Sequence, residues 1–567
     1  MLHAAIAGST IMPHRPPFAL LLACTLLAAC GRQPQATTLA VPSAAAGQPT
    51  APDNATTPGS FAFEEADIAD LQARMGSGEL SSHALTRAYL DRIAAIDDAG
   101  PTLNAVIELN PRALDEAHAR DAERKAGQVR GALHGIPVLL KDNIDATPMA
   151  NSAGSLALAN HHPKTDAFLV RRLREAGAVI LGKTNLSEWA NIRSSRSTSG
   201  WSARGGQTRN PYALDRSPCG SSAGTGSAIA ANLAVVGIGT ETDGSIICPS
   251  AVAALVGIKP TVGLVSRDGI IPISQSQDTA GPMARSVADA AALLAAISGR
   301  DAADAATQAG TGHAIADYAP HLKADGLAGA RIGVVRELMG YHPDVDAAMA
   351  RAIEAIKAAG ATVVDARIPT LAQWNDAEFE VFQYEFKAGV EAYLRKSGAP
   401  IRTLAGLIEF NRRHAPREMP YFDQDIFEQA QAKGPLTEPA YIAARAKARR
   451  LAGPEGIDAA LAAQDLDALV APSMSPAWLT NPINGDHFTG AGYGVAAVAG
   501  TPSITVPMGD SHGLPLGIVF MGPAWSEPRL LELAYAFEQK TRARKPPQFL
   551  QSVTPEIMVP APKLVTN

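Results

Sequence analysis

Glycine, serine and threonine are concentrated between residues 217 and 263, which read SPCGSSAGTGSAIAANLAVVGIGTETDGSIICPSAVAALVGIKPTVG. Small side chains leave many backbone N–H groups accessible, which is what a site for a developing oxyanion or a phosphate requires. A serine hydroxyl in such a segment becomes a nucleophile only when a base takes its proton. The segment therefore predicts anion-stabilising chemistry, with Ser221 and Ser245 as candidate hydroxyls.

Two common motifs compete for this segment. A nucleotide-binding P-loop requires Gly-Lys-Ser or Gly-Lys-Thr after its glycines, and no lysine stands there. Gly220–Gly224 fits Gly-x-Ser-x-Gly, the nucleophile elbow of α/β-hydrolases, but the elbow needs an apolar strand directly before it. Residues 210–219 contain two prolines and are typical of a loop. The elbow also needs a histidine, and His487 and His512 lie in glycine- and proline-rich surroundings that mark neither as catalytic.

A lysine ends a short apolar run upstream. Residues 135–142 read GIPVLLKD, which is typical of a buried strand that carries Lys141 at its end. A lysine accepts a proton only when neutral, and its ordinary pKa is near ~10.4, so a base near neutrality needs a pKa about 3 lower, or about 4 kcal/mol of desolvation. The alternative is a strand-end lysine paired with Asp142 or Asp145.

Helices and buried strands alternate around these residues. Apolar spacings of three and four predict amphipathic helices over 68–75 and 85–96. A helix over 167–176 precedes a buried strand over 177–182. The same pattern predicts strands at 332–335, 362–364, 469–471, 503–506 and 517–520, and helices at 345–359 and 529–539. We therefore expect an α/β fold with a central mixed, largely parallel sheet covered by helices on both faces.

Residues 373–447 differ in composition from the rest of the chain, because they contain many charged and aromatic side chains. We interpret this stretch as a helical insertion. It either shapes a substrate cleft or forms a solvated helical layer without substrate contact.

The sequence resembles the amidase signature family in several ordered elements. CGSSAG at 219–224 and GTETDGSI at 239–246 match the family, and Ser221 and Ser245 are 24 positions apart, which is the family spacing. The family's Gly-Ile-Pro-Val-x-x-Lys-Asp element is present at 135–142. Further matches are GIKPTVGL at 257–264, DTAGPMAR at 278–285 and AGTPSITVP at 499–507. The resemblance covers roughly residues 66–541 and implies the amidase signature fold.

The resemblance implies a role for each candidate residue. Ser245 is the expected nucleophile, Ser221 a bridging hydroxyl held by a cis peptide bond, and Lys141 the terminal base. The expected course is acylation of Ser245, release of ammonia protonated through Ser221, and hydrolysis of the acyl-enzyme by water. This chemistry requires no metal and no organic cofactor.

Further residues complete the expected site. The backbone N–H groups of Thr242, Asp243, Gly244 and Ser245 are the expected oxyanion hole, in which one donor is typically worth about 2.7 to 4 kcal/mol. Ser222 either donates a supporting hydrogen bond or belongs only to the turn.

Within the family, three segments look most like the peptide amidase branch, which removes ammonia from C-terminally amidated peptides. These segments are NLSEWA at 185–190, GWSARGGQ at 200–207 and TETDGSIICP at 240–249. Ile247 and Cys248 depart from the arginine-containing pattern of many family members, and the branch shares this departure. The expected substrate is therefore a peptide or small-molecule amide. Two alternatives are a catalytically idle envelope binding protein with this fold and a cytoplasmic component of a tRNA-dependent amidotransferase.

The first residues predict export. The apolar stretch 18–29, preceded by Arg15, is too short to span a bilayer of roughly 30 Å but suits a signal peptide over 1–29, with Met1 or Met12 as the start. LAACG at 27–31 resembles a lipoprotein processing box, which predicts a lipid anchor on Cys30 and an exported, membrane-anchored enzyme. The alternative is ordinary signal-peptidase cleavage and secretion. Low apolar content predicts a disordered tether over 30–60, before a domain at 61–545 and a tail at 546–567.

Charge and cysteine content limit the partners. The chain has 49 basic and 55 acidic residues without a long run of either sign, which argues against a nucleic-acid partner. Cys219 and Cys248 are the two cysteines beyond the export segment. We expect them to be two small buried thiols rather than a disulfide.

Overall fold

The computed structural model describes residues 61–553 of the 567-residue chain. The expected signal peptide, the tether and Cys30 lie outside the described residues, as do residues 554–567 of the expected tail. The first part of that tail is joined to the body, because Phe549 N donates to Pro211 O at 3.0 Å and Leu214 N donates to Leu550 O at 2.8 Å.

An 11-stranded sheet forms the centre of the described chain, in the order β1-β3-β2-β6-β8-β7-β12-β13-β11-β9-β10. The strands are β1 (Val106–Leu109), β2 (Pro137–Lys141), β3 (Val179–Thr184), β6 (Val236–Glu241), β7 (Val256–Lys259), β8 (Thr279–Ala284), β9 (Arg331–Val335), β10 (Thr362–Ala366), β11 (Ala468–Pro472), β12 (Ser503–Ser511) and β13 (Leu514–Met521). A separate hairpin pairs β4 (Trp201–Ser202) with β5 (Gly206–Gln207).

The expected α/β class with a mixed central sheet is confirmed, and of the ten strand pairs in this sheet four are parallel and six antiparallel, fewer parallel pairs than the expected largely parallel sheet. Parallel pairs occupy two blocks, β3-β2-β6 and β11-β9-β10. Antiparallel pairs join these blocks through β8, β7, β12 and β13, and β1 pairs antiparallel with β3 at one edge. The short connection from β12 to β13 permits only a hairpin, because a parallel connection needs a crossover of a dozen or more residues.

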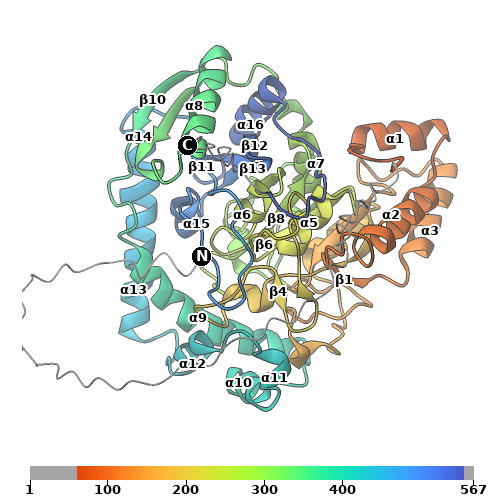
Figure 1. Cartoon of the computed structure of the whole chain (residues 1–567), viewed down its shortest axis with the longest axis horizontal. Helices are drawn as coiled ribbons and strands as arrows, with labels where there is room; N and C mark the ends of the chain where they lie inside the picture. Colours follow the sequence, from red (N-terminus) through yellow and green to blue (C-terminus); the bar gives the residue numbers. More distant parts are fainter. Residues whose placement is uncertain (1–60, 554–567) are drawn as a thin grey trace, which may run out of the picture.

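Helices surround the sheet (Figure 1). They are α1 (Ile68–Ser77), α2 (Ser82–Ile96), α3 (Ala113–Lys125), α4 (Phe168–Glu175), α5 (Ala223–Ala230), α6 (Ile247–Ala251), α7 (Val287–Ile297), α8 (Pro343–Ala358), α9 (Asn375–Lys396), α10 (Leu404–Arg413), α11 (Ala415–Glu418), α12 (Asp425–Gln431), α13 (Pro439–Ala452), α14 (Asp458–Ala462), α15 (Gly494–Ala499) and α16 (Glu527–Thr541). Each helix and strand expected from the hydrophobic pattern is present, within a few residues of the expected ends.

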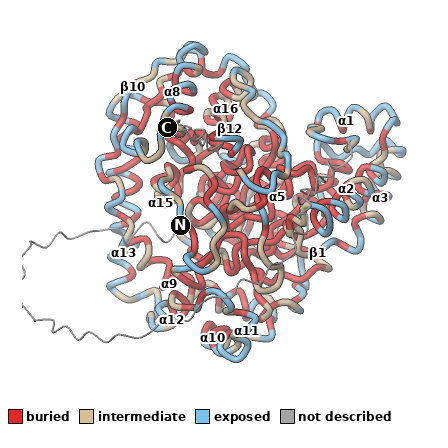
Figure 2. Tube along the Cα trace, viewed as in Figure 1, coloured by how far each residue is buried: buried red, intermediate tan, exposed pale blue. Residues whose placement is uncertain are grey.

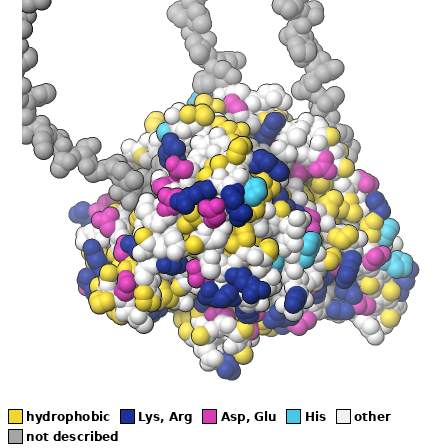
Figure 3. Space-filling model, turned by 90° about the horizontal axis from the view of Figure 1, so that it is seen from below, with side chains coloured by type: hydrophobic (Ala, Val, Ile, Leu, Met, Phe, Trp, Pro, Cys, Tyr) yellow, Lys and Arg dark blue, Asp and Glu magenta, His cyan; other side chains and the backbone are white. Residues whose placement is uncertain are grey.

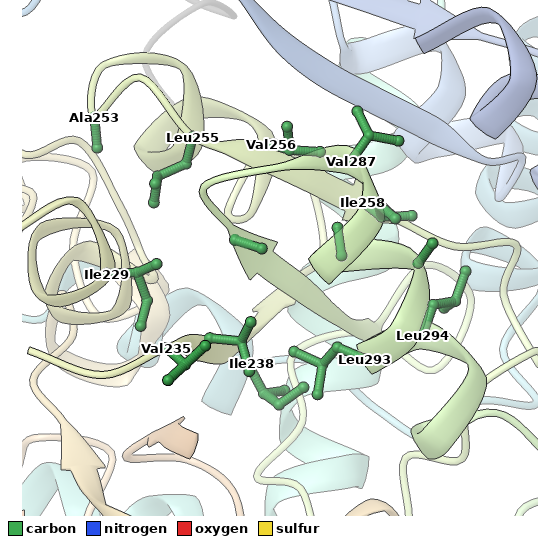
Figure 4. Close-up of a cluster of buried hydrophobic side chains, with 14 of the residues drawn as sticks. Ile229, Val235, Ile238, Ala253, Leu255, Val256, Ile258, Val287, Leu293 and Leu294 are labelled. Atoms are coloured by element: carbon green, nitrogen blue, oxygen red, sulfur yellow. The ribbon is translucent and has the colours of Figure 1, made fainter. Parts of the chain in front are cut away.

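The core lies between the sheet and its helices, where the buried segments of Figure 2 converge. One face of the sheet carries α7, α8 and α16, which contact one another through α16. Figure 4 shows part of this core, in which Ile238 and Ile258 from the sheet meet Leu293 and Leu294 of α7. Burial of these apolar side chains is the main favourable contribution to folding.

The opposite face of β6 has glycine at positions 237 and 239, so α5 and the turn before it can lie close to the strand. A Cβ atom at Gly237 would lie 2.6 Å from Thr225 Cγ2 of α5. A Cβ atom at Gly239 would lie 2.8 Å from both Ser222 Oγ and Met283 Sδ. These glycines therefore let the serine-rich segment approach the backbone of the sheet.

The expected helical insertion over 373–447 is present as α9 to α13, which lie along one side of the molecule (Figure 1). A buried ion pair ties this layer to the body, since Arg193 Nη1 donates to Glu188 Oε1 at 2.5 Å and also to the carbonyl of Glu418 in α11. On the face drawn in Figure 3, basic and acidic side chains are interspersed among uncharged ones. Within residues 61–553, no helix combines the length and the apolar character needed to cross a membrane.

Changing Gly239 to alanine tests the close approach of the serine-rich segment to β6. The new methyl group would overlap Ser222 Oγ, so we expect Gly239→Ala to lower the free energy of unfolding by about 1 to 3 kcal/mol. Gly76→Ala is the control, because no atom lies within 4 Å of its Cβ position and alanine suits helix α1 better by about 0.5 to 1 kcal/mol. Urea unfolding of both variants measures the effect, and equal stability of the two would contradict the packing argument.

Candidate active site

Lys141 lies at the end of β2 and its side chain is completely buried. Its Nζ donates to Ser221 Oγ at 2.8 Å, to Thr240 Oγ1 at 2.9 Å and to Thr240 O at 3.1 Å. The parallel pairing of β2 with β6 brings the lysine beside Thr240, because neighbouring parallel strands end at the same edge. The lysine is therefore held against a serine hydroxyl within the interior.

Burial lowers the pKa of Lys141 to about 7, although the negative charges of Glu241 and Asp278 act in the opposite direction. This value agrees with the expectation that desolvation brings the pKa of this lysine close to 7. At neutral pH a large fraction of Lys141 is then uncharged and can accept a proton.

The neighbouring carboxylates are occupied by other partners, so the alternative of a simple strand-end ion pair does not hold. Asp142 Oδ1 accepts from Lys183 Nζ at 3.1 Å, with both side chains fully buried. Asp145 Oδ1 accepts from Asn151 Nδ2 and from Tyr393 Oη, each at 2.6 Å. These contacts hold the end of β2, and they leave neither carboxylate paired with Lys141.

The serine-rich turn before α5 places Ser221 and Ser222. The peptide bond from Gly220 to Ser221 is cis, as the resemblance implied. Ser222 Oγ donates to Thr240 O at 3.1 Å and accepts from Thr240 N at 3.2 Å. Ser222 N donates to Ser245 O at 3.2 Å. Ser222 thus links β6 to the turn that carries Ser245, and this contact favours the supporting role over a purely local turn role.

Ser245 lies in the turn between β6 and α6. Glu241 holds this turn from inside, because its Oε2 accepts from Ile246 N at 2.7 Å and from Ile247 N at 2.9 Å. Gly244 has a φ of 76°, and a Cβ there would lie 2.3 Å from the Tyr493 ring. A side chain at position 244 would therefore disturb both the turn and its packing.

The turn carries the four backbone N–H groups that were expected to form an oxyanion hole, and one of them, the N–H of Gly244, faces the carboxylate of Glu241. In the described chain, the N–H groups of Thr242, Asp243 and Ser245 donate no hydrogen bond to another backbone or side-chain group. The side chain of Thr242 is fixed separately, because its Oγ1 donates to Asp278 Oδ1 at 2.6 Å. These N–H groups are thus available to a ligand, in the manner of an oxyanion hole.

A cavity of about 310 Å³ opens onto the two serines. Ser221 and Ser245 both line it, although their hydroxyls make no hydrogen bond to each other in the described chain. Ala392, Tyr393 and Lys396 of α9 line the same cavity. The helical insertion therefore lines the cavity, which favours the interpretation of residues 373–447 as part of a cleft over that of a solvated layer.

Cys219 and Cys248 form a disulfide, so the expectation of two buried thiols was wrong. Their Cα atoms are 6.0 Å apart, a separation that sequence spacing could not reveal. Cys219 stands two positions before Ser221 and Cys248 three positions after Ser245. The bridge therefore ties together the two serine-bearing segments.

Sequence reasoning missed three residues of the site. Thr240 accepts from Lys141 and also from Asn143 Nδ2, at 3.0 Å. Glu241 holds the Ser245 turn. Thr240 and Glu241 belong to the GTETDGSI segment, which is recognisable in the sequence. Their contacts could not be predicted from it, because they depend on how strands distant in the chain pair. Asn143 is two residues after Lys141 and carried no separate signal.

The chain belongs to the amidase family, because the family model described as Amidase matches residues 84–531. It is 40% identical over 505 residues to a probable amidase of Arabidopsis thaliana, covering 86% of this chain and 93% of that protein. It is also 36% identical over 504 residues to one of the subunits of the glutamyl-tRNA(Gln) amidotransferase of Salinispora arenicola, covering 85% of this chain and 98% of that protein. We therefore assign the chain to the amidase class of enzymes.

Solved structures relate it to one branch of that family. Native peptide amidase from Stenotrophomonas maltophilia is 61% identical, with a TM-score of 0.84 over 86% of this chain and 100% of that chain. Peptide amidase in complex with the competitive inhibitor chymostatin gives 61% identity and a TM-score of 0.85 over the same shares. The expected likeness to peptide amidase and the amidase signature fold are thus confirmed.

Removing the Cys219–Cys248 bridge tests its contribution to stability. The cysteines are 29 positions apart, and a loop of that size predicts a loss of about 3 to 4 kcal/mol in the double variant Cys219→Ala/Cys248→Ala. Thermal unfolding with and without reductant measures the change. Alkylation of the denatured, unreduced protein followed by peptide mapping provides the check. Free thiols at both positions would contradict the bridge.

Proposed function

We propose that this enzyme is a serine amidohydrolase that removes ammonia from the C-terminal amide of peptides. The observation that carries the proposal is the buried, partly neutral Lys141, whose Nζ lies 2.8 Å from the hydroxyl of Ser221 in a cavity that Ser245 also lines. The 61% identity to peptide amidase supports the peptide amide as substrate.

In the proposed mechanism, the hydroxyl of Ser245 attacks the amide carbon. Its proton passes to Ser221 Oγ while the proton of Ser221 passes to the neutral Nζ of Lys141. The proton then returns by the same route to the leaving nitrogen, and ammonia departs. Water repeats the sequence on the acyl-enzyme and restores the hydroxyl of Ser245.

The oxyanion is proposed to be held by the backbone N–H groups of Thr242, Asp243 and Ser245, because the fourth expected donor, the N–H of Gly244, faces the carboxylate of Glu241. Their geometry is fixed before substrate arrives, since Glu241 and Asp278 hold the turn at both ends. Preorganised donors of this kind need no rearrangement in the transition state. No step requires a metal or an organic cofactor.

We also propose that the enzyme is exported and anchored through a lipid on Cys30. The support is the signal-like stretch 18–29, the LAACG segment and the Cys219–Cys248 disulfide, because disulfides persist mainly in oxidising compartments. An exported enzyme would meet amidated peptides rather than charged tRNA. This favours the peptide amide over the substrate of the amidotransferase relatives. The other alternative, an idle binding protein, has no support in the comparisons.

Lys141→Met tests the base. Methionine occupies similar space but cannot accept a proton, so we expect ammonia release from an amidated dipeptide to fall by at least about 100-fold, the lower end of a general-base contribution. Lys164→Met is the matched control, because Lys164 is exposed and does not line the cavity. Circular dichroism checks that both variants fold. Full activity of Lys141→Met would remove lysine from the mechanism.

The pH dependence follows from the same residue. Lys141 is the base only when neutral, so kcat/KM should rise with pH, by about tenfold per unit well below 7, and level off above a pKa of about 7. An amidated dipeptide blocked at its N-terminus and without titratable side chains isolates the enzyme's ionisation. A profile that is flat from about pH 5 to about pH 9 would contradict a titrating lysine base.

The nucleophile is tested by covalent labelling. A serine-directed fluorophosphonate should modify Ser245, as mapped by mass spectrometry, and a peptide amide should protect it. The label should be absent from Ser245→Ala. A label on Ser221 in the native enzyme would overturn the assignment.

A further inference from the structure

A second cavity lies against the turn that carries Ser245. Its volume is about 520 Å³, and it is lined by Asp243, by the N-terminal part of α9 and by residues 486–495. Asp243 also precedes Ser245 by two positions, so the two Cα atoms are at most about 7 Å apart. This cavity and the serine cavity therefore flank the same turn.

Helix α9 contributes to both cavities. Trp374 and Glu378, at its beginning, line the second cavity, whereas Tyr393 and Lys396, near its end, line the serine cavity. Glu378 and Lys396 are 18 positions apart, which is about 27 Å along an α-helix. The same helix of the insertion therefore contacts two separate cavities, one on each side of the turn that carries Ser245.

Two carboxylate oxygens at the second cavity have no hydrogen-bond partner in the described chain. Glu378 is 8% exposed, its Oε1 accepts from Gln277 Nε2 at 2.9 Å, and its Oε2 has no hydrogen-bond partner in the described chain. Asp243 Oδ1 is enclosed and has no partner among residues 61–553 either. Asp486 differs, because its carboxylate accepts from Ser199 Oγ at 2.6 Å and from Trp478 Nε1 at 3.2 Å.

Among the described residues that line this cavity there is one basic side chain, His487, and no lysine or arginine. Burial raises the pKa of Asp243 to about 7, and burial followed by the charge of Asp243 raises the pKa of Glu378. A cation that enters beside two neighbouring carboxyl groups of this kind favours their ionised forms. The geometry of the cavity and its free acceptor atoms therefore fit a positively charged ligand.

The aromatic rings of Trp374, Phe488 and Tyr493 add a preference for an organic cation. These rings line the cavity together with aliphatic side chains such as Leu371 and Val495. Aromatic faces attract ammonium and guanidinium groups, and the apolar walls suit the methylene groups of a lysine or arginine side chain. A cavity of about 520 Å³ is also far larger than an ammonium ion.

We propose that this cavity is a specificity subsite in which Glu378 and Asp243 receive the cationic side chain of a lysine or arginine close to the scissile amide. The inference rests on the proposed function and narrows it to amidated peptides with a basic residue. Gln277 couples the subsite to the reacting turn, since its Nε2 donates to Glu378 Oε1 and, at 3.3 Å, to Thr242 O.

Matched substrates test the subsite. Two N-terminally blocked dipeptide amides that differ only in lysine against norleucine present the same chain length with and without the charge. In the native enzyme we expect kcat/KM for the lysine peptide to be at least about tenfold higher than for the norleucine peptide. Only the lysine side chain offers a charged partner to the unpaired acceptors of the cavity. In Glu378→Gln the ratio should fall towards unity. The ratio cancels any general loss of folded enzyme.

Asp376→Asn is the control, because Asp376 lies exposed in the first turn of α9 and does not line the cavity. Its ratio should equal that of the native enzyme. Hydrolysis of both peptides with a native ratio near unity would overturn the subsite and leave the proposed function intact. Hydrolysis of neither peptide would overturn the proposed function. Inhibition by ammonium chloride that Glu378→Gln relieves, without a preference for lysine, would overturn the subsite and assign the cavity to released ammonium instead.

Discussion

The burial of Lys141 is the constraint on which the rest of the site depends. An ammonium group in a fully buried position loses its hydration, and three oxygen acceptors compensate only in part. The neutral amine is thereby favoured, and a neutral amine is what a serine needs as a base. The strand β2 is buried at every residue, and Asp142 is already paired with Lys183, so this neighbouring carboxylate does not restore the charge.

Close approach of the backbone makes the remaining contacts possible. The serine-rich turn lies against a face of β6 on which Gly237 and Gly239 leave room. The hydroxyl of Ser222 can therefore form hydrogen bonds with both the N–H and the C=O group of Thr240. The disulfide joins the same turn to the helix after Ser245. Because several independent interactions hold the same two segments, the hydroxyls and N–H donors are fixed before substrate binds, which is the condition for electrostatic catalysis.

The helical insertion contributes to the walls of both cavities. Its long helix α9 lines the serine cavity at one end and the carboxylate-lined cavity at the other. The layer is fastened to the body by the buried Arg193, whose partners belong to the body and to α11. The sheet and turn thus carry the proposed reacting groups, while a separate helical layer lines the cavities beside them.

The sequence by itself determined the local features. Apolar runs and helical spacing located β2, β3 and the helices α1, α2, α4, α8 and α16, and the glycine-rich turn around Ser245 was recognisable because turn chemistry depends on adjacent residues. The roles of Ser245, Ser221 and Lys141 needed the resemblance to a family, since spacing alone does not give distance. Only the tertiary structure decided the antiparallel centre of the sheet, the Cys219–Cys248 bridge and the placement of Glu378 beside Asp243. Each of these depends on how segments far apart in the chain pack, and hydrophobic periodicity carries no information about that distance.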